Sequence, residues 1–330
     1  MRSLAPLFPE KTNLPEPIGE VWLTAVDCKI ATGPFAGKTL GDAWREMPPE
    51  WRGTRFSKPS DFPLLIKFIF PNDKLSIQVH PDDAYASVHE KTAGGRGKTE
   101  MWHVLSADPN ARVLIGLAPK ATRERFVKAI ETRTLEEIFI HWRVQPGDTF
   151  FVPAGTPHTI GPGVVLCEIQ EYSDLTYRVY DYGRMDAHGK PRELHIQKAL
   201  DVIEFGRSVG GKVPKLRLPS PGPKELLAAC PYFAAERWKI VTPTEVAMGT
   251  EHYDLFVVLT GCGEFAWGGK PEKFERGECW FIPAGLSGLA IKSRESTKLL
   301  QAYVPNLQTL RDRFKQENRS WQEIEKTVFD

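Results

Sequence analysis

The chain has 330 residues, of which 41% are hydrophobic and 26% are charged, as is usual for a globular protein. Its 43 Lys and Arg residues balance 42 Asp and Glu residues, and this net charge of +1 argues against a nucleic-acid binder while allowing a local phosphate site. The length favours two domain-sized units, and 27 Gly with 27 Pro residues favour short strands and turns over long helices.

Short strands dominate the elements predicted for the first third of the chain. They cover residues 62–70, 75–79, 98–105 and 112–117. In the second of these strands apolar and polar residues alternate, so that Gln78 and His80 share one face and their apolar neighbours share the other. By the same rule Lys98 and Glu100 share a face of the third strand.

Two helices follow in the prediction. Hydrophobic residues at helical spacing among charged ones predict a helix within residues 121–140, and another is predicted for residues 191–205. The rest is predicted as mostly short strands joined by turns. Residues 207–224, rich in Gly, Pro and Lys, are interpreted as a linker between domains at 1–206 and 225–330. The alternative is a long surface loop, although loops beyond about 12–15 residues are uncommon within compact domains.

An internal repeat supports two similar halves. Residues 146–155 match residues 276–285 without a gap, with Gly147 corresponding to Gly277 and Gly155 to Gly285. Each copy contains a turn, a short apolar strand and a Pro-Ala-Gly turn. A repeated unit of this kind predicts two similar β-domains.

The cysteines and the N-terminus point to a reducing compartment. No C-x-x-C pair occurs, which argues against a disulfide framework and against a thiolate zinc site. The first residues lack the apolar segment of a signal peptide, and no apolar run approaches the roughly 20 residues that span a bilayer. We therefore expect a cytoplasmic protein without a membrane, nucleic-acid or obligate protein partner.

The first copy of the repeat continues to a histidine. The spacing Gly147-x5-Pro153-x-Gly155-x2-His158 resembles the second motif of the cupin superfamily, and the second copy has Gly288 in place of the histidine. The resemblance implies a mainly β protein with two cupin-type jelly-roll β-barrels and small helical insertions. It also implies that only the N-terminal barrel carries the metal histidine. A turn residue without a ligand role is the alternative for His158.

Further polar residues complete a candidate metal site. His80, Glu100 and His158 offer two imidazoles and one carboxylate, a set that suits zinc with an open position and that iron(II) or manganese also uses. For Glu100 the alternative is a solvated carboxylate on a strand. Residues 173–184 interleave aromatic residues with Arg178 and acidic side chains, which is unusual for a plain surface strand. The alternative to a functional segment is a half-buried strand with an ion pair.

Four motifs occur in order along the chain. They are Gln78-Val79-His80-Pro81-Asp82-Asp83, Gly97-Lys98-Thr99-Glu100-Met101-Trp102, Pro153-Ala154-Gly155-Thr156-Pro157-His158 and Thr176-Tyr177-Arg178-Val179-Tyr180-Asp181. These motifs resemble those of the type I phosphomannose isomerases, in their short bacterial form. The resemblance extends from about Gly19 to Arg184, with the second barrel as a weaker continuation.

This resemblance implies a zinc enzyme that interconverts mannose 6-phosphate and fructose 6-phosphate. Its metal ligands correspond to Gln78, His80, Glu100 and His158, with one Zn2+ per chain in a site that other divalent metals can occupy. The chain departs from longer members in its length, in a reduced helical insertion near 121–140 and in the residues just before the motif arginine. A small-molecule sugar phosphate is the implied partner.

The implied chemistry transfers a proton between two sugar carbons through an enediol(ate). Arg178 would stabilise negative oxygen, and Lys98 would carry the proton if the metal and Arg178 lower its pKa. Asp174, Glu168 and a metal-bound water are alternative proton carriers. Lys98, Arg178 and Asp174 are the candidate substrate-binding residues. Alternative functions are an isomerase of another phosphosugar, an iron cupin oxygenase and a non-catalytic sugar-binding cupin.

Overall fold

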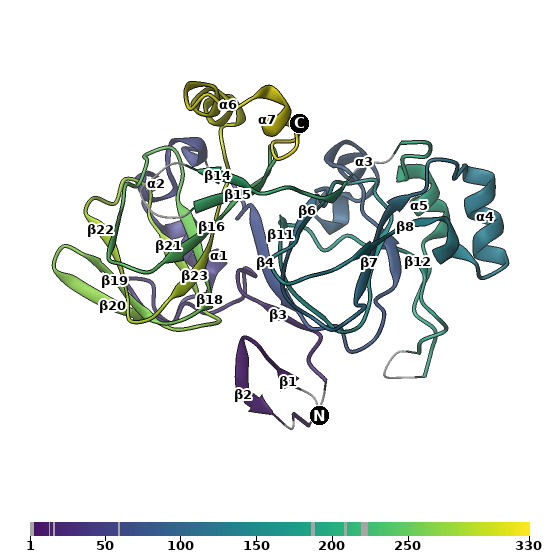
Figure 1. Ribbon diagram of the computed structural model, residues 1–330, viewed down its shortest axis with the longest axis horizontal. Helices are drawn as coiled ribbons and strands as arrows, with labels where there is room; N and C mark the ends of the chain where they lie inside the picture. Colours follow the sequence, from purple (N-terminus) through teal and green to yellow (C-terminus); the bar gives the residue numbers. More distant parts are fainter. Residues whose placement is uncertain are drawn as a thin grey trace. The chain divides into compact units, whose positions relative to one another are not determined.

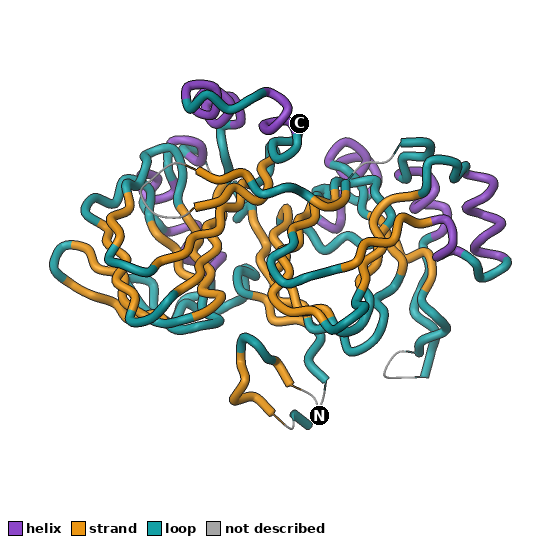
Figure 2. The backbone as a smooth tube through the Cα atoms, viewed as in Figure 1, coloured by secondary structure: helices purple, strands orange, loops and turns teal. Residues whose placement is uncertain are grey.

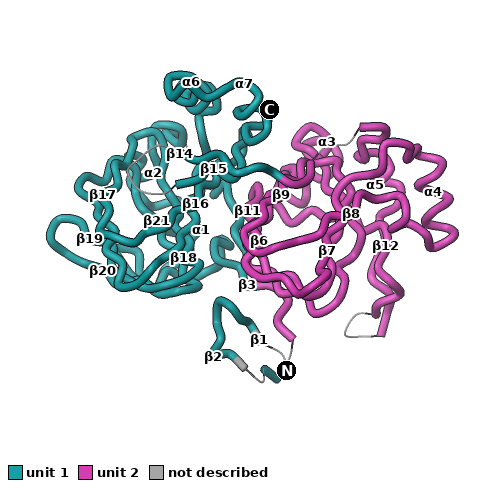
Figure 3. Tube along the Cα trace, viewed as in Figure 1, with its two compact units in different colours: residues 1–16, 21–67, 213–330 teal, residues 17–20, 68–212 magenta. Residues whose placement is uncertain are grey.

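The computed structural model describes residues 3–12, 14–15, 17–58, 60–185, 189–207, 210–218 and 224–330. The chain divides into two compact units (Figure 3), one made of residues 17–20 and 68–212 and the other of residues 1–16, 21–67 and 213–330. Strands predominate over helices in both units (Figure 2). The chain passes between the units within β3 (Glu20–Trp22) and β4 (Leu64–Ile69).

The unit that contains residues 68–212, here called the metal-site unit, is built on antiparallel strands (Figure 1). One sheet has the order β12-β5-β10-β7-β8, and a second contains β13, β9, β6 and β11 in that order. The strands are β5 (Ile77–Val79), β6 (Glu100–Ala107), β7 (Arg112–Leu117), β8 (Phe139–Arg143), β9 (Thr149–Val152), β10 (His158–Ile160), β11 (Val164–Glu171), β12 (Tyr177–Tyr180) and β13 (Gly211–Lys212). The helical segments are α3 (Asp83–His89), η2 (Lys91–Ala93), α4 (Arg123–Glu131), η3 (Leu135–Ile138) and α5 (Ile196–Val202).

Helices α4 and α5 cover one face of the five-stranded sheet. Phe126 of α4 and Leu200 of α5 belong to the same buried cluster as Ile77 and Val79 of β5. The alternation along β5 therefore turns Gln78 to the opposite face, as the sequence predicts. That opposite face packs on the second sheet through another buried cluster, which includes Trp102 of β6.

The other unit also contains two antiparallel sheets, of orders β14-β15-β16-β23-β18-β21 and β17-β22-β19-β20, besides the hairpin β1-β2. A buried apolar cluster between the two sheets includes Trp238, Phe256 and Phe265. Its strands are β1 (Ser3–Leu4), β2 (Phe8–Thr12), β14 (Leu216–Leu218), β15 (Lys224–Ala229), β16 (Ala234–Ile240), β17 (Thr244–Val246), β18 (Asp254–Thr260), β19 (Gly263–Trp267), β20 (Lys270–Phe274), β21 (Cys279–Ile282), β22 (Leu289–Ser293) and β23 (Thr297–Tyr303). Its helices are α1 (Leu40–Glu46), α2 (Pro49–Arg52), η1 (Thr54–Phe56), α6 (Leu307–Gln316) and α7 (Trp321–Glu325).

Residues 21–67 belong to this second unit, whereas the sequence-based boundary groups them with residues 68–206. Aromatic packing is the physical reason, because Trp44 contacts Tyr253 with ring centroids 5.3 Å apart. The predicted linker also contains short strands: β13 pairs with β9, and β14 pairs with β15. Positions 208–209 and 219–223 of the linker lie outside the described residues.

The predicted helices are shorter than expected, and several helices were not predicted. The segment 121–140 contains α4, then η3, and Phe139 already begins β8, because Arg133 has a φ of 59° and interrupts the helix. Helices α1, α6 and α7 occupy regions predicted as strands. Their start signals are present in the sequence: Thr39 and Asn306 cap α1 and α6, and Ser320 forms a capping box at α7. No helix among the described segments is long and apolar enough to cross a bilayer.

The internal repeat is visible in the structure. β9 and β21 occupy the same positions of the two copies, and Gly147 and Gly277 before them have φ values of 87° and 89°, which favour glycine. The neighbouring strands correspond as well. Glu100 of β6 is in register with Val152, and Asp254 of β18 is in register with Ile282, the counterpart of Val152. Asp254 is thus the counterpart of Glu100.

Candidate metal centre and active site

Three neighbouring strands of the metal-site unit bring Arg178, Gln78 and His158 into one row. Gln78 of β5 is in register with His158 of β10 on one side and with Arg178 of β12 on the other. Side chains of paired residues in antiparallel strands point to the same face of the sheet. His80 lies two residues beyond Gln78 and continues this face.

The facing sheet contributes two carboxylates linked by an indole. The register of β6 and β11 places Trp102 opposite Glu168, and all of these side chains are buried. The indole N–H of Trp102 lies 3.1 Å from Glu100 Oε1 and 3.0 Å from Glu168 Oε2, so one donor serves both carboxylates. Trp102 therefore restrains the orientation of Glu100.

His80, Glu100 and His158 form a buried cluster with the spacing of a metal site. Their ligand-type atoms all lie within 4.8 Å of one another. His80 Nε2 is 3.5 Å from Glu100 Oε2, and His158 Nε2 is 3.4 Å from Glu100 Oε1. Two atoms bound at about 2.0–2.1 Å to a tetrahedral zinc ion lie roughly 3.4 Å apart. The fold thus brings together the three residues that the sequence analysis selected.

Backbone carbonyls orient both imidazoles toward this cluster. His80 Nδ1 lies 2.7 Å from the carbonyl oxygen of Leu175, and His158 Nδ1 lies 2.9 Å from that of Thr156. A carbonyl oxygen only accepts hydrogen bonds, so each Nδ1 carries the proton and each Nε2 keeps its lone pair. Burial lowers the pKa of His158 to about 4, which keeps this imidazole neutral near pH 7. The donor set therefore fits a divalent metal such as zinc.

Gln78 borders the cluster. Its Nε2 lies 3.3 Å from His158 Nε2, and its Oε1 lies 3.2 Å from the Ser76 hydroxyl, which donates to it. Because a metal bond requires the amide oxygen, this orientation places Gln78 beside the three clustered residues. Its role as a ligand stays a prediction.

Lys98 is buried among carboxylates. Its Nζ lies 2.6 Å from Glu100 Oε2, 3.2 Å from His80 Nε2 and 3.8 Å from Glu168 Oε1. Burial by itself would lower the pKa of Lys98, but the charges of Glu100 and Glu168 outweigh burial and raise it. The lowered pKa expected for Lys98 depends on a bound metal as well as on Arg178, and it stays a prediction. Lys98 is an ammonium ion in this arrangement.

Arg178 is half-buried and near other positive charges. One of its terminal nitrogens donates to the Glu193 carbonyl oxygen at 3.2 Å, and its Nε is buried without a hydrogen-bond partner among the described residues. Burial lowers the pKa of Arg178, and the charges of Arg192 and Arg184 add to this effect. Asp181 binds both of these arginines. Neither arginine is among the predicted site residues, because only the fold brings them close to Arg178.

Asp174 lies at the exposed edge of this region. Its negative charge contributes to the raised pKa of Lys98, which places it near that ammonium group. The carbonyl of the next residue, Leu175, orients His80. The segment 173–175 thus connects a candidate substrate-binding residue to a candidate metal ligand.

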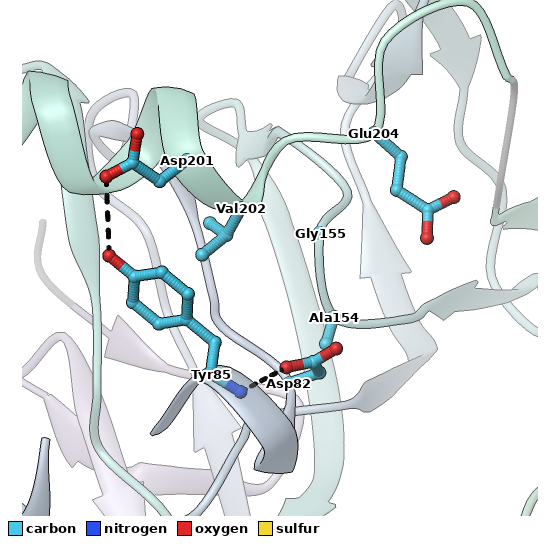
Figure 4. Close-up of a pocket in the computed structure, with 7 residues that line it drawn as sticks. All are labelled: Asp82, Tyr85, Ala154, Gly155, Asp201, Val202 and Glu204. Atoms are coloured by element: carbon cyan, nitrogen blue, oxygen red, sulfur yellow. Dashed lines mark hydrogen bonds between the residues drawn. The ribbon is translucent and has the colours of Figure 1, made fainter. Parts of the chain in front are cut away.

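A separate small pocket of about 140 Å³ lies outside the cluster (Figure 4). Asp82, Asp201 and Glu204 line it together with Tyr85, Ala154, Gly155 and Val202. Three carboxylates and no cationic side chain among the seven lining residues make it unsuitable for a phosphate group. None of the predicted site residues lines this pocket.

Comparisons with known proteins place these features in a family. Residues 3–102 match the model of the catalytic domain of type I phosphomannose isomerase. The chain is 34% identical over 278 residues to the probable mannose-6-phosphate isomerase GmuF of Bacillus subtilis, covering 83% of this chain and 86% of that protein. It is 35% identical over 272 residues to the mannose-6-phosphate isomerase of Streptococcus mutans, covering 81% and 83%.

Solved structures agree with this result. The mannose 6-phosphate isomerase of Bacillus subtilis matches with a TM-score of 0.78 and 31% identity over 86% of this chain and 89% of the other. A zinc-bound mannose 6-phosphate isomerase matches with a TM-score of 0.68 at 16% identity, over 88% and 91% of the two chains, which supports the fold alone. The expected mainly β fold class is confirmed. The chain belongs to the type I phosphomannose isomerase family.

Proposed function

We propose that this protein interconverts mannose 6-phosphate and fructose 6-phosphate with one zinc ion held by His80, Glu100 and His158. The observation that carries the proposal is the buried cluster itself, in which two carbonyl-oriented imidazoles present Nε2 toward a shared carboxylate. Gln78 is the proposed fourth ligand, after rotation of its amide. The names of the relatives supply mannose 6-phosphate as the substrate, and fructose 6-phosphate is its ketose isomer.

Aldose–ketose isomerisation moves a proton between C2 and C1 of the sugar and builds negative charge on oxygen. A bound divalent metal supplies a Lewis acid that polarises the substrate carbonyl. Arg178 stays cationic near neutral pH, and its Nε, which has no partner in the described part of the chain, is available to an oxygen that gains charge. We therefore assign Arg178 to stabilisation of the enediolate.

The contacts of Lys98 Nζ with Glu100 Oε2 at 2.6 Å and Glu168 Oε1 at 3.8 Å define its proposed role. We assign Lys98 to proton donation toward a substrate oxygen. Glu168, whose Oε1 lies 3.8 Å from Lys98 Nζ, is the proposed base that takes the proton from one sugar carbon and returns it to the other. Asp174, exposed beside this ammonium, is the proposed contact for a sugar hydroxyl. Arg178, Arg184 and Arg192 carry more positive charge than the single negative charge of Asp181 balances. This excess positive charge would attract the phosphate group.

A coupled isomerase assay on mannose 6-phosphate tests the proposal before chelation, after chelation and after zinc is returned. We expect chelation to abolish turnover and zinc to restore it. Turnover in heavy water should also exchange the C2 hydrogen for deuterium, and it should be equal under oxygen and argon. The variant Glu100→Gln should lose both bound zinc and turnover.

His103→Gln is the matched control. His103 is also buried on β6, but its Nδ1 lies 3.1 Å from the Thr149 hydroxyl, and it is not part of the metal cluster. This variant should retain zinc. Turnover that resists chelation, or sugar binding without C2 exchange, would refute a zinc isomerase.

A further inference from the structure

We propose that Gln170 is a substrate-binding residue whose Oε1 accepts a hydrogen bond from a sugar hydroxyl. The inference rests on the proposed function, because it takes the ligand to be a phosphorylated sugar. It concerns a residue on β11 that the motifs and the relatives do not assign.

The amide of Gln170 has a defined orientation. Its Nε2 lies 2.9 Å from the carbonyl oxygen of Glu171 and 2.5 Å from that of Ser173. Carbonyl oxygens only accept, so the NH2 group must face both of them. The Oε1 atom is therefore held away from this turn as a fixed acceptor.

This acceptor is buried and has no partner. The Gln170 side chain is completely buried, and its Oε1 makes no hydrogen bond with any residue in the described part of the chain. Leaving a buried acceptor unpaired is costly, so such an atom in a native structure calls for a partner. A donor from a bound ligand would satisfy it.

The position of Gln170 on its strand indicates where the donating molecule would bind. Its Cα is in register with Glu100 across β6 and β11, and Glu168 lies two residues earlier on the same strand and face. Gln170 is thus the direct strand neighbour of a candidate metal ligand.

The facing sheet supplies the complementary atom. Arg178 Nε is a buried donor without a partner among the described residues, and Arg178 is in register with Gln78. Among the described residues, each sheet of the site therefore has one unpaired polar atom beside a candidate metal ligand, an acceptor on one sheet and a donor on the other. A polyhydroxylated ligand, whose hydroxyls both donate and accept, matches this pair.

The test crosses a variant with substrate analogues. Wild type and Gln170→Met are assayed for kcat/KM on mannose 6-phosphate and on its 3-deoxy and 4-deoxy analogues, and zinc affinity is measured for both proteins. One deoxy analogue should lose about 10- to 100-fold in kcat/KM with wild type and show little further loss with the variant. The zinc measurement separates loss of this contact from loss of the Gln170 NH2 group, which holds the Ser173 carbonyl of the segment that orients His80.

Gln301→Met is the matched control. Gln301 is also a buried glutamine, but both ends of its amide are bonded, its Nε2 to Asp254 Oδ1 at 2.8 Å and its Oε1 to the Trp238 indole N–H at 2.8 Å. This variant should discriminate between the analogues as wild type does.

Three results would overturn the inference. If wild type and Gln170→Met lose kcat/KM by the same factor on each deoxy analogue, Gln170 contacts neither hydroxyl. A variant that loses zinc affinity and still discriminates between the analogues as wild type does would show that the residue only supports the turn. Absence of turnover by zinc-loaded wild type would instead refute the proposed isomerase, and with it the sugar ligand.

Discussion

Trp102→Phe is the sharpest test of how the metal cluster is held together. The substitution removes the single N–H that serves Glu100 and Glu168. It leaves an aromatic ring where the indole packs edge-on against His158, with ring centroids 5.4 Å apart. All candidate metal ligands remain in the variant. Any change in metal binding then reports on orientation of the carboxylate.

The expected magnitude follows from the contacts. A hydrogen bond to a charged group contributes about 1.5–3 kcal/mol, and Glu100 retains its bond to Lys98 Nζ at 2.6 Å. Removing a residue that orients a metal ligand typically weakens metal binding by about 10- to 100-fold. We expect this range for Trp102→Phe, which corresponds to about 1.4–2.7 kcal/mol.

Competition for zinc with a chromophoric chelator measures the effect. Trp142→Phe is the control, because its indole donates to the Ile115 carbonyl oxygen at 3.2 Å and makes no bond to the cluster. Its zinc affinity should match that of wild type. A natively folded Trp102→Phe variant with unchanged zinc affinity would refute the reasoning.

Two further predictions concern stability. Burial raises the pKa of Asp254 from 3.8 to about 7, so the folded chain holds a proton that the unfolded chain has lost, and stability falls as the pH rises between these values. Asp254→Asn should flatten this pH dependence in urea unfolding and raise the free energy of unfolding by up to about 4 kcal/mol at pH 8. An unchanged pH slope would contradict a raised pKa for Asp254. In Gly155→Ala the new Cβ would lie 2.9 Å from the Val202 carbonyl oxygen, whereas in the repeat counterpart Gly285→Ala its nearest contact is 3.5 Å away. Since both glycines have positive φ, Gly155→Ala should lose ~1–2 kcal/mol more unfolding free energy, and equal losses would exclude the clash as a cause.

Local patterns in the sequence predicted much of the metal-site unit. Strand alternation placed Gln78 and His80 on one face, and the Gly-Pro-Gly spacing identified His158. These signals depend on residues close together in the chain. Helix α4 was overextended because hydrophobic spacing continues through Leu135 and Ile138, although the backbone at Arg133 is left-handed.

Long-range pairing accounts for what the sequence left undetermined. Trp102 and Glu168 meet because β6 and β11 pair in one register, and no pattern within either strand specifies that register. Gln170 was missed for a similar reason, since its importance depends on which of its amide atoms the fold leaves unpaired. The carboxylates around Lys98 likewise come from both strands, and no pattern within either strand specifies that their charges together raise its pKa.

The short segment after β11 gives the site one further property. Gln170 holds the Ser173 carbonyl, and two residues later the Leu175 carbonyl holds His80. A sugar that engages Gln170 would therefore restrain the same segment that orients the imidazole of a candidate metal ligand. Binding free energies are reciprocal, so zinc and sugar phosphate should each increase the affinity of the other. In the cell, such cooperativity would retain the metal most firmly when substrate is abundant.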